Sequence, residues 1–354
     1  MITPVKKVNR LFMLALAPFV GLMLCMLLIR PPLEPGDFID SGLAEETITP
    51  QTQAISQELA GAKEAAVQTS SSIKRTTQLY KQTTSTMTTL VQKATVQAAR
   101  PGTIYNQRIT SKLGVPFERI DSDRLTLELY RVNPGTYKGY AMKIKLKDPT
   151  AMKMALDSEP GRSETTMQAV KRSGAIAGIN AGGFADSGGK RYPLSTTVMD
   201  GKYVNGFQAS FKDLFFVGLD HTGKLVGGKF FDKGSLDRLQ PQFGATFVPV
   251  LLQNGQKTVI PAKWKMSPKR APRTVIGNYK DDQLLIIVVD GYNEAGSSGA
   301  TLEELQGRLY KLGVVDAYNL DGGGSSSLIV NNRVVNNPSD GNLRPVPTHF
   351  LFYK

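Results

Sequence analysis

A run of uncharged residues from Leu11 to Ile29 constrains this chain more than any other feature, because such a segment avoids water. At about 1.5 Å per residue, a helix of this length nearly spans a roughly 30 Å hydrocarbon core. Lys6, Lys7 and Arg10 precede the run, and Arg30 follows it. This excess of cations on the N-terminal side favours a cytoplasmic N-terminus. We therefore expect a single-pass membrane protein whose C-terminal part is extracytoplasmic.

A cleaved signal peptide is the alternative interpretation of residues 11–29. The run is longer than the usual apolar core of about 7–15 residues, and no small-residue cleavage site follows it, so a signal anchor is favoured. The one cysteine of the chain, Cys25, lies inside the run. An exported part without disulfides suits a Gram-positive bacterium, which is the cell type that we expect.

Residues 34–102 differ from the rest in being rich in Gln, Thr, Ser and Ala. They contain a seven-residue series: Leu59, Ala66, Ile73, Tyr80, Met87 and Ala94. Such a series is typical of a coiled coil, through which the chain could self-associate. Thr and Ala bury little apolar area, so we favour a solvated single helix or a disordered stalk over this weak coiled coil. In each case residues 34–102 are a spacer, and residues 103–354 are the globular part.

Residues 103–354 have the pattern of short strands separated by turns. Tyr140–Leu146 alternates between apolar and polar residues. Asp200–Gly201 and Asn254–Gly255 are hairpin signals between apolar runs, and Asn331–Asn332 is a weaker one.

A strand–helix–strand unit stands out near the C-terminus. Leu284–Val289 is an apolar strand, and Thr301 with Glu304 forms a capping box that opens a helix. The helix carries a leucine stripe that we interpret as core, and it ends at Gly313 before the strand Val314–Leu320. We expect an α+β (mixed α/β) domain, with a strand-rich mixed sheet and few helices.

The scarcity of cysteine and histidine excludes several chemistries. One cysteine and two histidines rule out Cys-based zinc sites, iron–sulfur clusters and a three-histidine zinc centre. We expect His221 to be a turn residue and His349 to be structural. Catalysis must then use carboxylates, arginines, amides, hydroxyls and backbone N–H groups, and we expect no cofactor and no metal.

Four polar loops that adjoin apolar strands are candidate site loops. They present Asn180, Arg273, Asp290 with Glu294, and Asp321. Asp290 and Asp321 each end an apolar strand, and these two strands flank one helix. If the strands are parallel and close, both carboxylates emerge at the same edge of a sheet, where α/β proteins form ligand sites.

The loop after Asp321 is the most informative of the four. Gly322, Gly323 and Gly324 are followed by Ser325, and Asn319 lies just before them. Consecutive glycines allow close approach of a ligand and can turn several N–H groups towards an anionic oxygen. A glycine-rich turn whose aspartate caps its own backbone is the alternative.

These segments resemble a known family. PRTVIG, the run from VVDGYNEAG to NLDGGGSSSL and the terminal RPVPTHFLF resemble the phosphodiester glycosidase domain, the family of the lysosomal uncovering enzyme. GINAGGF and YPLSTTVMDGKYV resemble its upstream motifs. The resemblance covers about residues 105–354. Its bacterial members are often labelled as exopolysaccharide-biosynthesis proteins. The animal enzyme has disulfides and a C-terminal anchor, whereas this domain has no cysteine and its expected anchor is N-terminal.

The resemblance implies a glycosidase that cleaves an anomeric carbon–oxygen bond whose leaving group is a phosphate. We expect Asp290 and Asp321 to form the carboxylate pair, with Glu294 in reserve. Arg273, Arg344 and the glycine N–H groups would stabilise the phosphate.

Within the same expectation, Asn180 and Asn319 would hold sugar hydroxyls or an N-acetyl group. The substrate would be an envelope glycan or glycan phosphate.

The charge of the chain suits an anionic partner. Its formal net charge is +13, and residues 101–354 contain 33 Lys and Arg against 23 Asp and Glu. Such an excess attracts polyanions. Outside a cell these are anionic lipids, phosphodiester polymers or acidic polysaccharides, and nucleic acid is not expected. A non-catalytic module that binds an anionic cell-wall polymer is therefore the alternative function.

Overall fold

The computed structural model describes residues 45–157, 159–291 and 299–354. The predicted membrane segment 11–29 lies outside these residues, as does Glu294. Among the residues that are described, no helix is both long and apolar enough to cross a membrane. The described chain divides at residue 91, and residues 92–354 form the second and larger unit.

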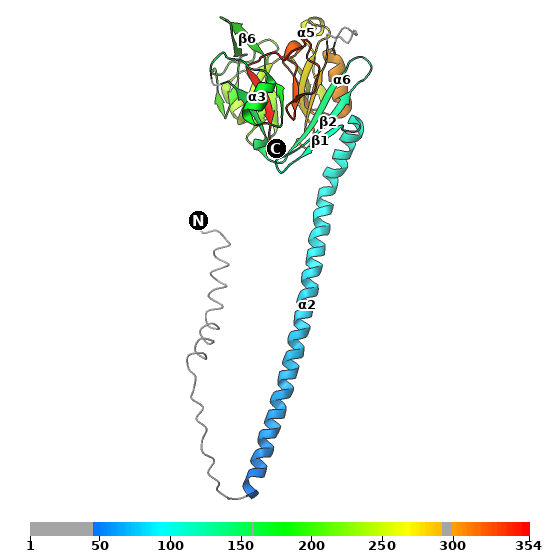
Figure 1. The fold of residues 1–354 in the computed structure, drawn as a ribbon, viewed down its shortest axis with the longest axis vertical. Coiled ribbons are helices and arrows are strands. Elements are labelled where there is room, and N and C mark those ends of the chain that lie inside the picture. Colours follow the sequence, from blue (N-terminus) through cyan, green and yellow to red (C-terminus); the bar gives the residue numbers. More distant parts are fainter. Residues whose placement is uncertain (1–44, 158, 292–298) are drawn as a thin grey trace. The chain divides into compact units, whose positions relative to one another are not determined.

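Residues Glu45–Leu113 form one α-helix, α2 (Figure 1). The helix continues through Pro101, although proline lacks the N–H that an interior position donates. We expected strands and turns from residue 103 onward; instead, residues 103–113 are helical. Ile109 and Leu113 explain this extension, because both are buried in the core of the second unit.

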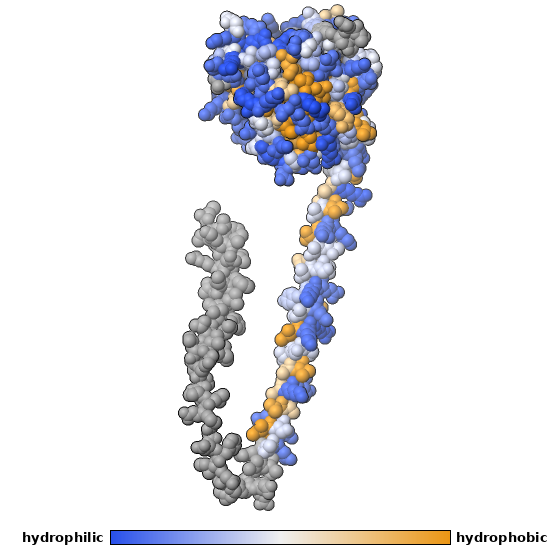
Figure 2. All heavy atoms as spheres, in the orientation of Figure 1, coloured by the Kyte–Doolittle hydropathy of each residue, from blue (hydrophilic) through white to orange (hydrophobic). Residues whose placement is uncertain are grey.

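The described part of the stalk is therefore helical. Its apolar side chains are exposed in this single chain, including four of the seven-residue series, which are 60–71% exposed: Leu59, Ile73, Tyr80 and Met87. Figure 2 shows such side chains interspersed with polar ones along α2. Self-association through this helix stays a prediction.

The largest sheet has eight strands in the order β1-β2-β3-β16-β15-β17-β13-β14. Their bounds are Glu118–Asp121 (β1), Leu125–Val132 (β2), Gly139–Leu146 (β3), Leu284–Val289 (β16), Arg273–Asn278 (β15), Asp316–Leu320 (β17), Val250–Gln253 (β13) and Gln256–Lys257 (β14). This sheet contains the strands from which Asp290 and Asp321 emerge.

Two five-stranded sheets and a two-stranded ribbon complete the strand structure. One sheet, in the order β11-β10-β12-β8-β9, consists of Leu225–Gly228, Phe215–Asp220, Pro241–Phe247, Val198–Met199 and Lys202–Tyr203. The other, in the order β19-β18-β5-β20-β4, consists of Arg333–Val334, Leu328–Val330, Ala177–Asn180, Thr348–Phe352 and Met152–Leu156. The ribbon pairs β6 (Phe184–Ser187) with β7 (Lys190–Pro193).

The strand pairing corrects one expectation about the sheet. We expected a mixed sheet, whereas every pairing between named strands in the described residues is antiparallel. The strands β16 and β17 do run in the same direction. However, they are not neighbours. The chain passes from β16 through α6 to β17 across β15, which lies between them and is antiparallel to both.

Helices are few in the second unit, as expected. After the end of α2 they are α3 (Thr166–Ser173), α4 (Lys233–Asp237), α5 (Ala262–Met266) and α6 (Leu302–Leu312), with the short 3₁₀ helices η1 (Pro149–Ala151) and η2 (Gly323–Ser325). The capping box at Thr301 and Glu304 is present, and Gly313 ends α6 in the left-handed conformation with φ 83°. The prediction of this helix is confirmed.

The hairpin predictions are also confirmed. Residues Asp200–Gly201, Asn254–Gly255 and Asn331–Asn332 connect β8 to β9, β13 to β14 and β18 to β19. All six residues have positive φ angles. Gly, Asn and Asp tolerate this conformation better than other residues, which is why the sequence signal was clear.

Two apolar cores cover the two faces of the eight-stranded sheet. The first core joins one face of β2, β3, β15, β16 and β17 to both five-stranded sheets. The second core joins the other face to α6 and the end of α2. Because the central strands are buried on both sides, their polar residues are concentrated at the strand ends.

Candidate active site

Three predicted site residues come together at one edge of the eight-stranded sheet. Arg273 begins β15, and it lies opposite Val289, the last residue of β16. Thr274 lies opposite Leu320, the last residue of β17. The residues that follow these two strand ends are Asp290 and Asp321, so both carboxylates flank the start of β15. The predicted grouping at one sheet edge is therefore present.

The Asp321 carboxyl group has an environment that favours its neutral form. One oxygen, Oδ1, accepts a hydrogen bond from the N–H of Gly322 at 3.0 Å. The other, Oδ2, is buried and has no hydrogen-bond partner among the described residues. Burial raises the pKa of Asp321 to about 6, although the neighbouring Ser325 hydroxyl and the charges of Arg344 and Arg191 oppose the shift. A carboxyl group with this pKa can take up or release a proton near neutral pH.

The Asp290 carboxyl group is also perturbed. Its Oδ1 accepts a hydrogen bond from the N–H of Asn337 at 2.8 Å. Burial raises the pKa of Asp290, and the N–H of Asn337 partly offsets this effect. Gly322 and Asn337 stand at the two ends of one segment, residues 322–337, so the same segment supports both carboxylates. Convergence of the two into one cleft stays a prediction.

Asn180, the last residue of β5, is fully buried, and its amide forms hydrogen bonds with three other segments of the chain. Its Oδ1 accepts hydrogen bonds from Thr274 Oγ1 at 2.8 Å and from Ser327 N at 3.1 Å. Its Nδ2 donates to the Asp321 carbonyl at 2.6 Å. These contacts favour a positioning role over the direct substrate contact that we expected from the sequence.

Asn319 is similarly enclosed. It is buried, and its Nδ2 donates to the carbonyl of Val248 at 2.6 Å. The amide therefore connects β17 to the segment that precedes β13. This placement gives Asn319 a structural contact instead of an exposed surface for sugar.

The glycine loop is tightly packed. The N–H of Gly322 binds Asp321, and the N–H of Gly323 donates to the carbonyl of Pro272 at 2.9 Å. Gly323 itself has a φ of 59°. A Cβ at Gly324 would collide with the Arg344 guanidinium and the Asp340 carboxylate. The N–H groups of Gly322 and Gly323, which we expected to bind phosphate, therefore form hydrogen bonds within the protein. The absence of a side chain at Gly324 leaves room for the Arg344 guanidinium.

Two of the predicted arginines, Arg273 and Arg344, differ in how far they are exposed. Arg273 is buried, and its Nη2 donates to the Pro268 carbonyl at 2.9 Å. Arg344 forms an ion pair with Asp340 at 2.8 Å and keeps about a third of its side chain exposed (36%). Arg344 is therefore better placed than Arg273 to meet an incoming anion.

Arg191 is a site residue that sequence reasoning missed. It ion-pairs with Asp186 at 3.1 Å, stacks over Phe184 at 4.8 Å and donates to the Pro345 carbonyl. Its charge lowers the pKa of Asp321 and so opposes the larger effect of burial. The available signal was its place in the segment KRYPL, directly before the family-like motif.

The two histidines are placed as expected. His349 is fully buried, and burial lowers its pKa to about 3, so it is neutral. Its Nδ1 lies 3.2 Å from the Thr166 hydroxyl, which lies 2.6 Å from the Ser327 hydroxyl. His349 therefore supports the loop that carries Ser327. His221 is in a surface turn after β10.

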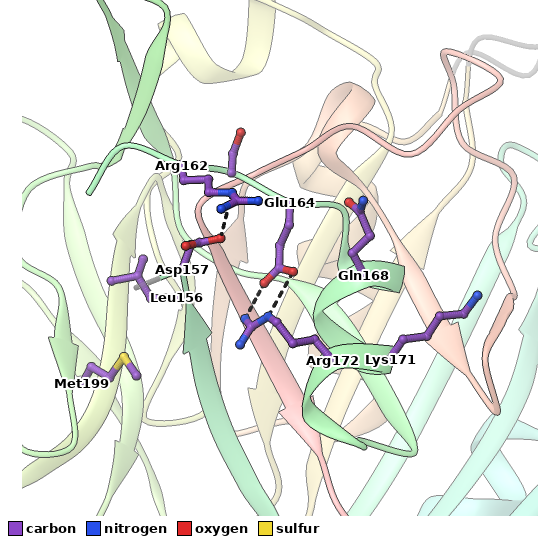
Figure 3. Close-up of a pocket in the computed structure, with 9 residues that line it drawn as sticks. Leu156, Asp157, Arg162, Glu164, Gln168, Lys171, Arg172 and Met199 are labelled. Atoms are coloured by element: carbon purple, nitrogen blue, oxygen red, sulfur yellow. Dashed lines mark hydrogen bonds and ion pairs between the residues drawn. The ribbon is translucent and has the colours of Figure 1, made fainter. Parts of the chain in front are cut away.

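A cavity of about 790 Å³ is lined by residues from the end of β4, the segment that follows it and α3. Figure 3 shows two ion-paired clusters in it, Asp157 with Arg162 and Glu164 with Arg172. Leu156, on its wall, pairs with Thr348 on β20, next to the residue that pairs with Asn180. The cavity and Asn180 are therefore at the same end of this sheet. Most of its charged side chains form ion pairs, so the lining is polar and has a small net charge.

No cluster of three or more metal-binding side chains exists within the described part of the chain. The ionisable groups that the structure places at this site are carboxylates and arginines. The buried Asp321, whose pKa is about 6 and which feels the charges of Arg344 and Arg191, is the candidate centre of this site.

A model of the phosphodiester glycosidase family matches residues 173–353, and the chain belongs to this family. The match confirms the resemblance seen in the sequence. The family is described as one of phosphodiester glycosidases.

Two curated relatives illustrate the similarity. Over 189 residues the chain is 30% identical to the SPbeta prophage-derived uncharacterized protein YomE of Bacillus subtilis (strain 168), covering 52% of this chain and 28% of that protein. Over 175 residues it is 28% identical to N-acetylglucosamine-1-phosphodiester alpha-N-acetylglucosaminidase of Mus musculus, covering 46% of this chain and 33% of that protein. The chain thus spans a third or less of the length of these relatives.

The fold is similar to that of one solved structure, the zebrafish N-acetylglucosamine-1-phosphodiester alpha-N-acetylglucosaminidase catalytic domain, auto-inhibited by its pro-peptide. The TM-score is 0.55 at 20% identity, over 68% of this chain and 89% of that one. This likeness concerns the fold alone.

Proposed function

We propose that this protein is a membrane-anchored extracytoplasmic glycosidase that hydrolyses a sugar 1-phosphodiester in envelope glycans or glycan phosphates. The single observation that carries the proposal is the buried Asp321 carboxyl group beside Arg344 and Arg191, within a domain of the phosphodiester glycosidase family. The relatives named for hydrolysis of an N-acetylglucosamine 1-phosphodiester supply the substrate class.

The proposed reaction breaks the bond between the anomeric carbon and a phosphate oxygen. The bonding electrons leave with the phosphate monoester, and water supplies the new oxygen at the anomeric carbon. Arg344 and Arg191 would neutralise charge on the departing phosphate, which needs little help from an acid. Arg273, which is buried at the start of β15, would add positive charge at the same end of the sheet.

The carboxylates act on the sugar side. Asp321, ionised above pH about 6, would stabilise the positive charge that develops at the anomeric carbon, and Asp290 would act as its partner. One of the two takes the proton of the attacking water or attacks the carbon itself. Asn180 would hold the Asp321 backbone in place through its 2.6 Å hydrogen bond.

The cavity of about 790 Å³ would receive the remainder of the substrate. Its lining suits a hydroxyl-rich chain, because four of its charged side chains form ion pairs with one another and the lining still offers polar groups. The excess of basic residues in the domain would attract an anionic glycan.

The test is turnover of a panel of sugar 1-phosphodiesters, including one of N-acetylglucosamine, by the purified protein. Asp321→Asn and Asp290→Asn should each abolish turnover while the protein stays folded. Asp200→Asn is the matched control, because Asp200 is an exposed turn residue with φ 51°, a conformation that asparagine accepts.

A specific outcome would favour the alternative function. Tight, saturable binding of a phosphodiester polymer, without turnover of any substrate in the panel, would make the domain a binding module. The basic composition of residues 101–354 is the observation that supports this alternative.

The membrane proposal has its own test. Protease added to intact protoplasts should digest the C-terminal domain and leave a small protected N-terminal fragment. Protection of the C-terminal domain would overturn the proposed topology.

A further inference from the structure

A second cavity, of about 550 Å³, lies on the other side of the eight-stranded sheet from the core that contains β5. Its walls come from the last turn of α2, the loop between β2 and β3, and α6. It belongs entirely to the second unit of the chain. Nothing in the proposed mechanism uses it.

The acidic residues of this cavity are already paired with cations that do not line it. Glu303 lies 3.7 Å from Lys265, and Glu304 lies 3.0 Å from Arg270. The basic residues that line the cavity are Lys112, Arg308 and Lys311. None of these three has a carboxylate partner within residues 45–157, 159–291 and 299–354.

Two buried donors in the cavity wall have no acceptor. Tyr137 is 3% exposed, and its hydroxyl has no hydrogen-bond partner in the described part of the chain; the same is true of Arg308 Nε. An unsatisfied buried polar group costs about 1–3 kcal/mol. Both groups can donate a hydrogen bond, and arginine cannot accept one. The missing partner of Arg308 Nε is therefore an acceptor, which the Tyr137 hydroxyl can bind as well, and an anionic oxygen fits best beside three cations.

The position of the cavity connects it to the proposed active site. The carbonyl of Lys138, the residue after Tyr137, accepts a hydrogen bond from the N–H of Asp290 at 3.0 Å. A ligand held by Tyr137 would thus act one residue away from the backbone that holds a candidate catalytic carboxylate.

We propose that this cavity is a second, non-catalytic site that binds a phosphate group, with Arg308 and Tyr137 as its central donors and Lys112 and Lys311 around them. Phosphate presents several acceptor oxygens, which matches a wall made of donors. The apolar side chains of Leu312 and Pro134 complete the lining, so the phosphate can be that of an ester. The proposal does not depend on whether Asp321 is catalytic.

The test is calorimetric titration of the full-length protein in detergent with inorganic phosphate at constant ionic strength. Saturable binding should weaken roughly tenfold in Arg308→Gln, because a hydrogen bond to a charged group is lost. Lys202→Gln, at an exposed β9 position, is the matched control and should bind as the wild type does. The weakening caused by Arg308→Gln should persist in an Arg344→Ala background, which separates this site from the proposed active site.

Tyr137→Phe supplies a second measurement. Removing the unsatisfied hydroxyl should stabilise the phosphate-free protein, while weakening phosphate binding severalfold. Separate titrations with a soluble phosphodiester and with phosphatidylglycerol vesicles distinguish a free phosphate ester from a lipid headgroup. Absence of saturable phosphate binding, or equal weakening in Lys202→Gln, would overturn the proposal.

Discussion

Replacing Asp321 by asparagine should make the protein inactive and, at neutral pH, more stable. Folding buries a carboxyl group whose pKa rises from 3.8 to about 6. Between these two pH values, the folded state keeps a proton that the unfolded state releases. Wild-type stability therefore falls as the pH rises through this window and stays lower above it.

The size of the effect follows from the pKa shift. Each pKa unit corresponds to about 1.4 kcal/mol, so the ionised Asp321 costs the folded state about 3 kcal/mol at pH 8. Asparagine has nearly the same shape and no charge at either pH. At pH 4 the wild-type carboxyl group is neutral in the folded state but partly ionised in the unfolded state, so only about 0.6 kcal/mol of this cost is present there.

The assay is urea unfolding of both proteins at pH 4 and pH 8, followed by fluorescence. The chain has a single tryptophan, Trp264, in α5, so the signal reports on the second unit alone. The stability of Asp321→Asn relative to wild type should increase by about 2.4 kcal/mol between the two pH values, because part of the effect is already present at pH 4. A relative stability that does not change with pH would refute the assignment of a strained, buried charge to Asp321.

Three further outcomes are expected. Arg344→Ala removes a cation that lowers the pKa of Asp321, so the acidic limb of the pH–rate profile should move to higher pH; an unmoved limb would contradict this pairing. Thr301→Ala removes the capping box of α6 and should cost about 1 kcal/mol in urea unfolding, with an unchanged midpoint as the contrary result. If the seven-residue series forms a coiled coil, residues 45–354 should sediment as a higher oligomer than residues 92–354, whereas two monomers would leave α2 a single helix.

The elements with strong local signals could be predicted from the sequence. The hairpins at Asp200, Asn254 and Asn331 depend on residues that accept positive φ, and α6 depends on a capping box and a terminal glycine. These determinants lie within a few neighbouring residues, so no knowledge of the tertiary structure is needed. The same holds for the position of Asp290 and Asp321 at strand ends.

The pairing of distant strands could not be predicted in this way. Insertion of β15 between β16 and β17 makes the sheet antiparallel, and nothing in the apolar run of Leu284–Val289 encodes its neighbours. Likewise, Arg191 joins the site through contacts with residues more than a hundred positions away, such as Pro345. The sequence also could not reveal that the Asn180 amide is occupied by Thr274, Ser327 and Asp321.

Arg344 lies so close to Gly324 that one added carbon atom, the Cβ of an alanine at this position, would change the electrostatics of the site. Gly324 has no positive φ, so alanine would fit its backbone, but the added methyl group would occupy the place of the guanidinium. Displaced from Asp340, Arg344 would no longer favour the ionised form of Asp321. An uncharged substitution at position 324 would thereby change the charge state of a carboxyl group three residues away, so screens that mutate only ionisable residues would overlook one of the positions that set the working pH range.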